Sequence, residues 1–303
     1  PPLWTIALGA ALPAFLLAFP FLFTTPFSHH LLILILLYAL MAQSWNVVAG
    51  FAGMISLGHV MFFGIGAYSA TVPFVKFGLS PWIGLIVGIV LSALAAIAVD
   101  VPRLRLRGHY FAIATLLIGA SVQIIVQRWD WVGAASGLYV PIDRTSPWTS
   151  LQFHTSKVPY YYLALSAAAL GYAVVWALRR TGLGFRLQAM RVDPEAAASL
   201  GIAVARHKVL AFMISAAMMS VAGTFYAQYV LVLDPERLLS ADISIIVVLM
   251  MVLGGSGTLW GAGRRRAPRE RLVRCSPWSS SSLSNAALYA AVPVRSIFMG
   301  SRS

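Results

Sequence analysis

The stretch PWIGLIVGIVLSALAAIAVD occupies residues 81–100, and no charged side chain occurs in it before Asp100. An apolar run of this length can cross the hydrocarbon core of a bilayer as an α-helix. Similar runs recur along the chain, without the strict alternation of apolar and polar residues that is typical of half-buried strands. We therefore predict an all-α, polytopic bundle of transmembrane helices.

The composition supports a membrane protein. Of the 303 residues, 59% are hydrophobic and 10% are charged, whereas about 25% are charged in an ordinary soluble domain. A water-soluble fold is therefore excluded, and the length allows about eight or more spans. The apolar runs predict spans at 3–22, 31–49, 57–75, 82–100, 109–127, 159–178, 208–227 and 241–259.

Basic residues are unevenly distributed among the loops between these spans. The loops 102–108 and 179–208 contain nine Lys and Arg residues, and the alternating loops 128–158 and 228–240 contain four. Because cytoplasmic loops carry the excess of Lys and Arg, the first two loops and the N-terminus are predicted to be cytoplasmic. The net charge of +13 thus reflects membrane topology and does not indicate binding to nucleic acid.

The longest predicted cytoplasmic loop contains signals for a short helix. Asp193 suits the N-cap, Pro194 the first helical position, and Glu195 the positive end of the helix dipole, while Gly201 is a typical residue just after a helix. The alanine-rich helix between them is about 10 Å long at 1.5 Å per residue. Two interpretations stay open, a connector on the membrane surface and a docking helix for another protein.

The glycine-rich block 50–66 predicts a broken helix within the membrane. A break frees backbone groups, which are tolerated only where protein or a water-lined cavity satisfies them, and free helix ends suit a zwitterionic substrate. Ser56, Gly58 and His59 in this block are the candidates for lining a substrate path. The competing interpretations are close helix packing at glycines such as Gly66, and a hydrogen-bonded structural histidine.

Nothing in the sequence favours an enzyme, a metal or a cofactor. The block Gly254-Gly255-Ser256-Gly257 resembles an intramembrane serine protease site, but no histidine follows His207 to act as general base. The histidines are not paired with carboxylates or thiols in zinc-like spacing, and Cys275 is the single cysteine. Glycine is never followed by lysine, so no P-loop exists and any ATP must bind to a separate subunit.

Several motifs together resemble a known family. Glu195-Ala196-Ala197 followed by Gly201 is similar to the EAA loop of ABC importer permeases, which in that family docks into a groove on the cytoplasmic ATPase. Over about residues 30–262 the chain resembles branched-chain amino-acid permeases of the LivM type. This wider resemblance rests on four blocks: GFAGMISLGH at 50–59, FFGIGAY at 62–68, RLRGHYFA at 105–112 and VLGGSGTLWG at 252–261.

The resemblance implies a transport permease of the bacterial cytoplasmic (inner) membrane, without catalytic residues, that imports branched-chain or related small amino acids by alternating access. The implied partners are two ATP-binding subunits, a second homologous permease, an extracytoplasmic substrate-binding protein and the lipid bilayer. The residues implied in coupling to the ATPase are Arg191, Asp193, Glu195, Ala196, Ala197 and Gly201.

Two other functions are considered. An ion-coupled secondary transporter or channel for a small polar solute needs a carboxylate deep in a span, and the candidates Asp100 and Asp242 lie near span ends. Alternatively, the chain is an assembly partner that has no substrate path of its own.

The last 41 residues differ from the rest in composition. We predict a permease domain at 1–262, with the coupling loop at 179–207, followed by an atypical tail at 263–303 that contains eight Arg and a run of serines. We interpret this tail as the product of a frameshift that replaced the native C-terminus. The alternative is a basic cytoplasmic tail held at anionic lipid headgroups.

Overall fold

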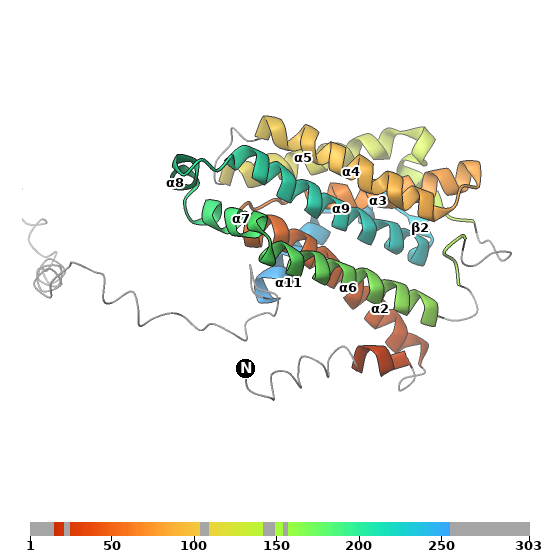
Figure 1. Ribbon diagram of the computed structural model, residues 1–303. Coiled ribbons are helices and arrows are strands. Elements are labelled where there is room, and N and C mark those ends of the chain that lie inside the picture. The colour runs from red at the N-terminus through yellow and green to blue at the C-terminus, as the bar shows by residue number, and fades with distance from the viewer. Residues whose placement is uncertain (1–14, 21–24, 104–108, 142–148, 154–156, 255–303) are drawn as a thin grey trace, which may run out of the picture. The chain divides into compact units, whose positions relative to one another are not determined.

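A computed structural model describes residues 15–20, 25–103, 109–141, 149–153 and 157–254 (Figure 1). The chain divides into two compact units, 1–262 and 263–303, and all described residues belong to the first. The described elements are, in chain order, α2 (Pro26–Trp45), η1 (Asn46–Phe51), α3 (Val60–Phe77), α4 (Pro81–Arg103), α5 (His109–Arg128), η2 (Asp130–Val132), η3 (Ala134–Ser136), β1 (Leu138–Tyr139), α6 (Val158–Arg180), α7 (Gly182–Val192), α8 (Pro194–Ser199), α9 (Val204–Val230), β2 (Val232–Leu233), α10 (Pro235–Leu238) and α11 (Ala241–Gly254).

Seven helical segments in the described part of the chain are long and apolar enough to cross a membrane. They coincide with seven of the predicted spans, so the helical, multi-span fold is confirmed. The remaining predicted span, 3–22, lies mostly outside the described residues, as do residues 255–259 and the tail. A count of eight or more spans therefore stays a prediction. Strand structure among the described residues is limited to β1 and β2, two residues each.

Helix α9 lies at the centre of the helix packing and contacts α2, α3 and α4 (Figure 1). The helices α3 and α9 approach so closely that a Cβ atom at Gly66 would lie 2.1 Å from the backbone oxygen of Ser220. The Thr224 hydroxyl also donates to the Gly66 carbonyl, at 3.0 Å. Small residues allow such backbone contact between membrane helices, so Gly66 has the packing role considered for it.

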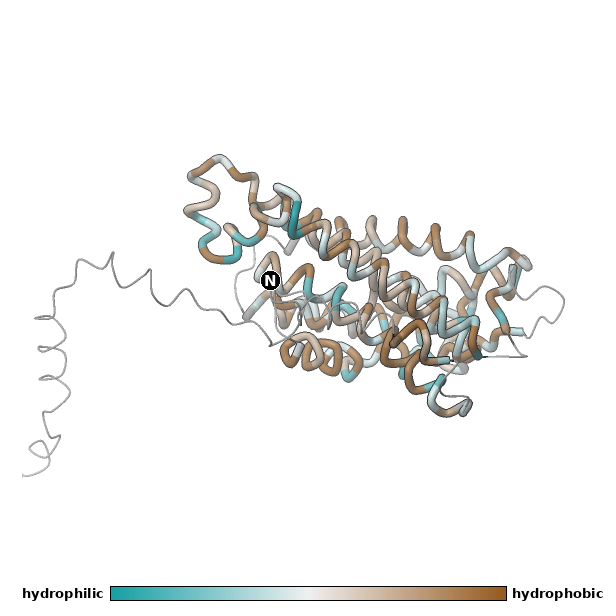
Figure 2. The backbone as a smooth tube through the Cα atoms, turned by 60° about the horizontal axis from the view of Figure 1, so that its bottom comes forward, coloured by the Kyte–Doolittle hydropathy of each residue, from teal (hydrophilic) through white to brown (hydrophobic). Residues whose placement is uncertain are grey.

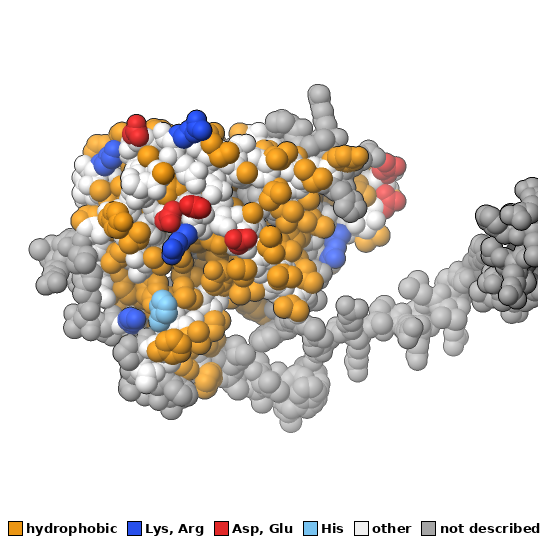
Figure 3. All heavy atoms as spheres, turned by 180° about the vertical axis from the view of Figure 1, so that it is seen from behind, with side chains coloured by type: hydrophobic (Ala, Val, Ile, Leu, Met, Phe, Trp, Pro, Cys, Tyr) orange, Lys and Arg blue, Asp and Glu red, His pale blue; other side chains and the backbone are white. Residues whose placement is uncertain are grey.

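The helices differ in how much protein covers them. In the most apolar stretch of α3, 61% of residues are buried, against 17% in α5. Hydrophobic residues predominate along the helices (Figure 2), and hydrophobic side chains cover much of the face seen from behind in Figure 3, with acidic and basic side chains scattered among them. Apolar side chains with this exposure suit contact with lipid or with another membrane helix.

A small antiparallel ladder joins two connecting segments. β1 pairs with β2, with Leu138 opposite Leu233 and Tyr139 opposite Val232. The helices α7 and α8 lie at the other end of the helices from β2 (Figure 1). The two ends of the bundle are therefore built differently, one from short helices and the other from the ladder and α10.

Candidate functional site

The chain is not helical between η1 and α3, at residues 52–59, and this segment contains the three path candidates. Its backbone is held by neighbouring side chains. The indole Nε1 of Trp45 donates to the Ser56 carbonyl at 2.7 Å, and the Leu57 amide donates to Thr115 Oγ1 at 2.9 Å. These hydrogen bonds explain why α3 begins at Val60 rather than at residue 57, where the hydropathy pattern places the start of the span.

His59 belongs to a buried polar cluster that joins three segments. Its Nε2 lies 2.6 Å from Ser215 Oγ in α9. The Ser215 hydroxyl donates to the Ser44 carbonyl at 2.5 Å, and the Ser44 hydroxyl donates to the Ser215 carbonyl at 2.7 Å. Because the Ser215 hydroxyl has one hydrogen and gives it to a carbonyl, its oxygen is left to accept a hydrogen bond from His59 Nε2.

Aromatic rings enclose His59. The centroids of Phe62 and Phe212 lie 5.2 Å and 5.3 Å from the imidazole, each in an edge-to-face arrangement. The side chain of His59 is buried, with 1% exposure. The described contacts thus match the structural interpretation of this histidine, with the imidazole joining α3 to α9.

The other two path candidates differ from each other. Ser56 is also buried, and its hydroxyl has no hydrogen-bond partner within the described residues. Gly58 packs on α5, where an added Cβ would lie 1.8 Å from the Thr115 carbonyl oxygen. An unpartnered buried hydroxyl is unfavourable by about 1–3 kcal/mol. Of the three candidates, Ser56 therefore offers a polar group that can bind something else.

The predicted short helix in the long loop is present as α8. Asp193 Oδ1 accepts hydrogen bonds from the amides of Glu195 and Ala196, at 2.9 Å and 3.1 Å, which confirms Asp193 as the N-cap. Gly201 has a φ of +82°, and its amide donates to the Ala198 carbonyl at 2.9 Å. Local sequence signals thus determine both ends of this helix.

The surface of α8 is exposed and bordered by apolar side chains. Ala197 is buried, whereas Glu195 and Ala196 are exposed. Val192 precedes the helix and Leu200 follows it, and these residues are 87% and 83% exposed. An exposed helix with apolar residues at both ends is suited to enter a groove on another protein.

Arg191 contacts its own chain. One guanidinium nitrogen, Nη1, donates a hydrogen bond to the backbone carbonyl of Gly50 in η1. The two residues are separated by 141 positions, so no local pattern predicts this contact.

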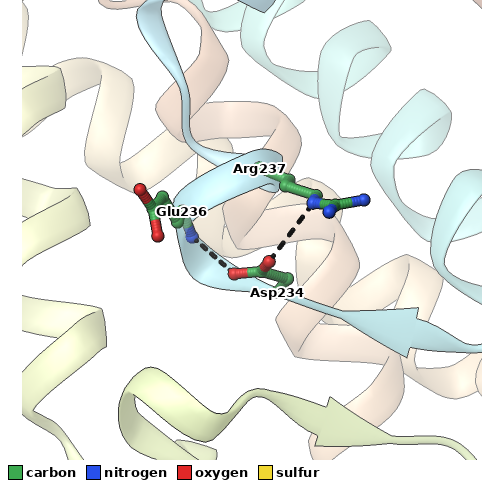
Figure 4. Close-up of polar contacts among 3 residues, drawn as sticks. All are labelled: Asp234, Glu236 and Arg237. Carbon is green, nitrogen blue, oxygen red and sulfur yellow. Dashed lines mark hydrogen bonds and ion pairs between the residues drawn. The ribbon is translucent and has the colours of Figure 1, made fainter.

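The opposite end of the molecule carries a small charged group (Figure 4). Asp234 caps α10 by accepting from the Glu236 amide at 3.0 Å, and one of its oxygens lies 3.5 Å from Arg237 Nε. The Arg237 side chain is 91% exposed, so this ion pair contributes little to stability. Asp242, the candidate carboxylate for ion coupling, is exposed in the first turn of α11.

Known proteins resemble this chain over most of its length. Residues 29–263 match the family described as branched-chain amino acid transport system, permease component. The high-affinity branched-chain amino acid transport system permease protein LivM of Escherichia coli strain K12 is 33% identical over 246 residues, which cover 74% of this chain and 58% of that protein. LivM of Salmonella typhimurium strain LT2 is 33% identical over 244 residues, covering 74% of this chain and 57% of that protein.

A more distant relative is named for a different class of solute, the nucleosides. The nucleoside ABC transporter permease protein NupC of Lactococcus lactis is 26% identical over 190 residues, covering 58% of this chain and 59% of that protein. The chain thus spans less than two thirds of the length of the curated relatives it matches. No solved structure gives a significant match to the chain.

Proposed function

Because this chain belongs to the family of branched-chain amino acid transport system permeases, we propose that it is the membrane-spanning subunit of an ATP-driven importer for branched-chain or related small amino acids. It works by alternating access and performs no bond chemistry itself. Two ATP-binding subunits, a second homologous permease and an extracytoplasmic substrate-binding protein complete the importer.

The observation that carries this proposal is the exposed helix α8. Its N-cap and its left-handed C-terminal glycine delimit a six-residue helix, and Val192 and Leu200 offer apolar surface at its two ends. We propose that this helix enters a groove on an ATP-binding subunit. ATPase closure then moves α8, and α7 transmits the displacement to the membrane segment.

The excess of Lys and Arg in the loop 179–208 supports a cytoplasmic position for α7 and α8. Under this orientation the N-terminus is also cytoplasmic, and the β1–β2 ladder with α10 faces the extracytoplasmic binding protein. The membrane is the bacterial cytoplasmic membrane, in which the chain passes several times.

The segment 52–59 is the proposed wall of the substrate path. The Ser56 hydroxyl is the group available to a passing substrate, because it is buried without a partner in the described chain. Gly58 and His59 keep the wall in place through their contacts with α5 and α9. Such a hydroxyl oxygen can accept a hydrogen bond from the ammonium group of a substrate.

The docking proposal is tested with Glu195→Arg and Gly201→Asp in the affinity-tagged chain, purified from its native membranes in mild detergent. Both variants should insert normally but retain little ATPase activity in the eluate and support little uptake. Glu195→Arg places a cation at the positive end of α8, and Gly201→Asp puts a side chain at a φ of +82°.

Matched controls are available on α7. Gln188→Arg adds a cation at an exposed position, and Gly182→Asp adds a carboxylate where a Cβ meets nothing within 4 Å. Both controls should behave like the unmodified chain. Normal ATPase retention and uptake in Glu195→Arg and Gly201→Asp would refute docking through α8.

The second candidate function is ion-coupled transport, which the sequence left open. Its carboxylate would be Asp242, which lies at the end of α11 and whose amide bonds to Ser240 Oγ at 3.0 Å. Uptake by vesicles distinguishes the two functions. Vanadate, an inhibitor of ATPases, should abolish ATP-driven uptake, whereas a protonophore should abolish uptake coupled to protons.

A further inference from the structure

A contact between α7 and the end of η1 joins the short helices α7 and α8 to the segment that precedes α3. Arg191 lies in the last turn of α7, and its guanidinium donates to the carbonyl of Gly50, a buried residue in the last turn of η1. The interaction links two parts of the chain that are 141 residues apart. It is therefore a tertiary contact that no local motif requires.

The Gly50 carbonyl needs a partner of this kind. The helix ends at Phe51, so its last carbonyls lack the following N–H groups that a continued helix would supply. The Met54 amide, which could have served Gly50, donates instead to the Val48 carbonyl at 3.1 Å. A cation at the C-terminal end of a helix is also favoured by the helix dipole.

Gly53 allows the side chain of Arg191 to reach this carbonyl. Gly53 has a φ of +70°, and a Cβ atom built there would lie 2.9 Å from Arg191 Cγ and 3.4 Å from Arg191 Cβ. The aliphatic part of the arginine thus packs on a bare backbone while its head group bonds to Gly50. Any side chain at Gly53 would be strained and would push the arginine away.

From this contact the chain reaches the proposed path within a few residues. Ser56 follows Gly53 by three positions, and its carbonyl is held by Trp45. On the other side, Asp193, the N-cap of α8, follows Arg191 by two positions. The Arg191 contact is therefore a short physical connection between α8 and the segment that contains Ser56.

We infer that Arg191 is a positioning residue that transmits displacement of α7 and α8 to residues 50–59, and that the contact persists through the transport cycle. This inference rests on the proposed docking of an ATP-binding subunit at α8. One nitrogen of the guanidinium is thereby used within the chain.

The first test separates coupling from docking. The complex carrying Arg191→Met should keep its ATP-binding subunits and hydrolyse ATP. Uptake per ATP hydrolysed should fall about tenfold, which corresponds to a loss of about 1.4 kcal/mol. Arg191→Lys keeps a cationic donor and should recover part of this loss. Loss of the ATP-binding subunits in Arg191→Met would instead assign the guanidinium to the docking surface and overturn the inference.

The second test replaces the contact by a covalent bond. The Cβ separation of 3.4 Å between positions 53 and 191 is close to that of a disulfide, so Gly53→Cys with Arg191→Cys should crosslink in a Cys275→Ser background. With the two thiols reduced, this variant should hydrolyse ATP without coupled uptake. With the disulfide formed, it should regain uptake, and reduction of the disulfide should abolish uptake again. The two single-cysteine variants should not respond to oxidation.

Two results of the second test would overturn the inference: absence of the crosslink, or oxidised complexes that remain uncoupled. Full uptake by the reduced variant would do so as well, because the contact would then be dispensable. A failure of the proposed function is recognised separately, since the chain without substitutions would then retain no ATPase and show no vanadate-sensitive uptake.

Discussion

Removal of the α8 cap by Asp193→Ala should weaken the short helix by a calculable amount. The carboxylate accepts from two backbone amides, those of Glu195 and Ala196, at 2.9 Å and 3.1 Å. Replacing such an N-cap by alanine costs about 0.5–2 kcal/mol. A six-residue helix has little stability of its own, because isolated helices shorter than about 12–15 residues are marginal in water. Most of the cap's contribution should therefore appear as local unfolding.

Taking about 1 kcal/mol as the cost, the population of the folded helix relative to the open loop should fall about fivefold. Hydrogen exchange of a peptide covering residues 190–203 measures this directly, and binding of the ATP-binding subunit should weaken in proportion to the lost folded fraction, by at most the same factor. Asp193→Asn is the control, since an asparagine oxygen also caps well. If Asp193→Ala leaves both exchange and binding unchanged, the cap does not hold α8 and the reasoning from its two hydrogen bonds is wrong.

Three further predictions concern the membrane interior. Ser215→Ala removes the acceptor of His59 Nε2 and should destabilise the chain by about 1–3 kcal/mol, measured as a lower midpoint of thermal unfolding in detergent. Gly66→Leu should prevent α3 and α9 from packing, because its Cβ would lie 2.1 Å from the Ser220 carbonyl oxygen; the yield of folded protein measures this, with Gly182→Leu as the control. Ser56→Trp should abolish uptake while the importer still assembles on affinity purification, and uptake at the normal rate would favour a chain without a path of its own.

Features encoded locally were predictable from the sequence. The apolar run at 81–100 corresponds to α4, and the signals at Asp193 and Gly201 delimit α8, because hydropathy and helix caps depend on neighbouring residues. The start of α3 was placed at residue 57 and lies at Val60. Hydropathy does not predict this difference, because hydrogen bonds with Trp45 and Thr115, 11 and 58 positions away, hold the preceding segment.

Contacts between distant segments were not predictable. Ser44 and Ser215 are 171 positions apart, and nothing in either neighbourhood marks them as partners. The same holds for Arg191, which the sequence assigned to a partner protein by analogy and which the structure joins to Gly50. One chain gives the types of side chain available to a site, whereas their pairing depends on how the helices pack.

The paired serines of α2 and α9 constrain how this family can vary in sequence. Each hydroxyl donates to the carbonyl of the other residue, so each serine fills a place shaped by its partner. Because both acceptors are backbone carbonyls, which every residue has, either serine can become alanine without removing the acceptor of the other hydroxyl. A large side chain at either position would not fit, because both serines are fully buried. Positions 44 and 215 should therefore stay small among homologues, and a sequence that changes one serine to alanine can keep the other.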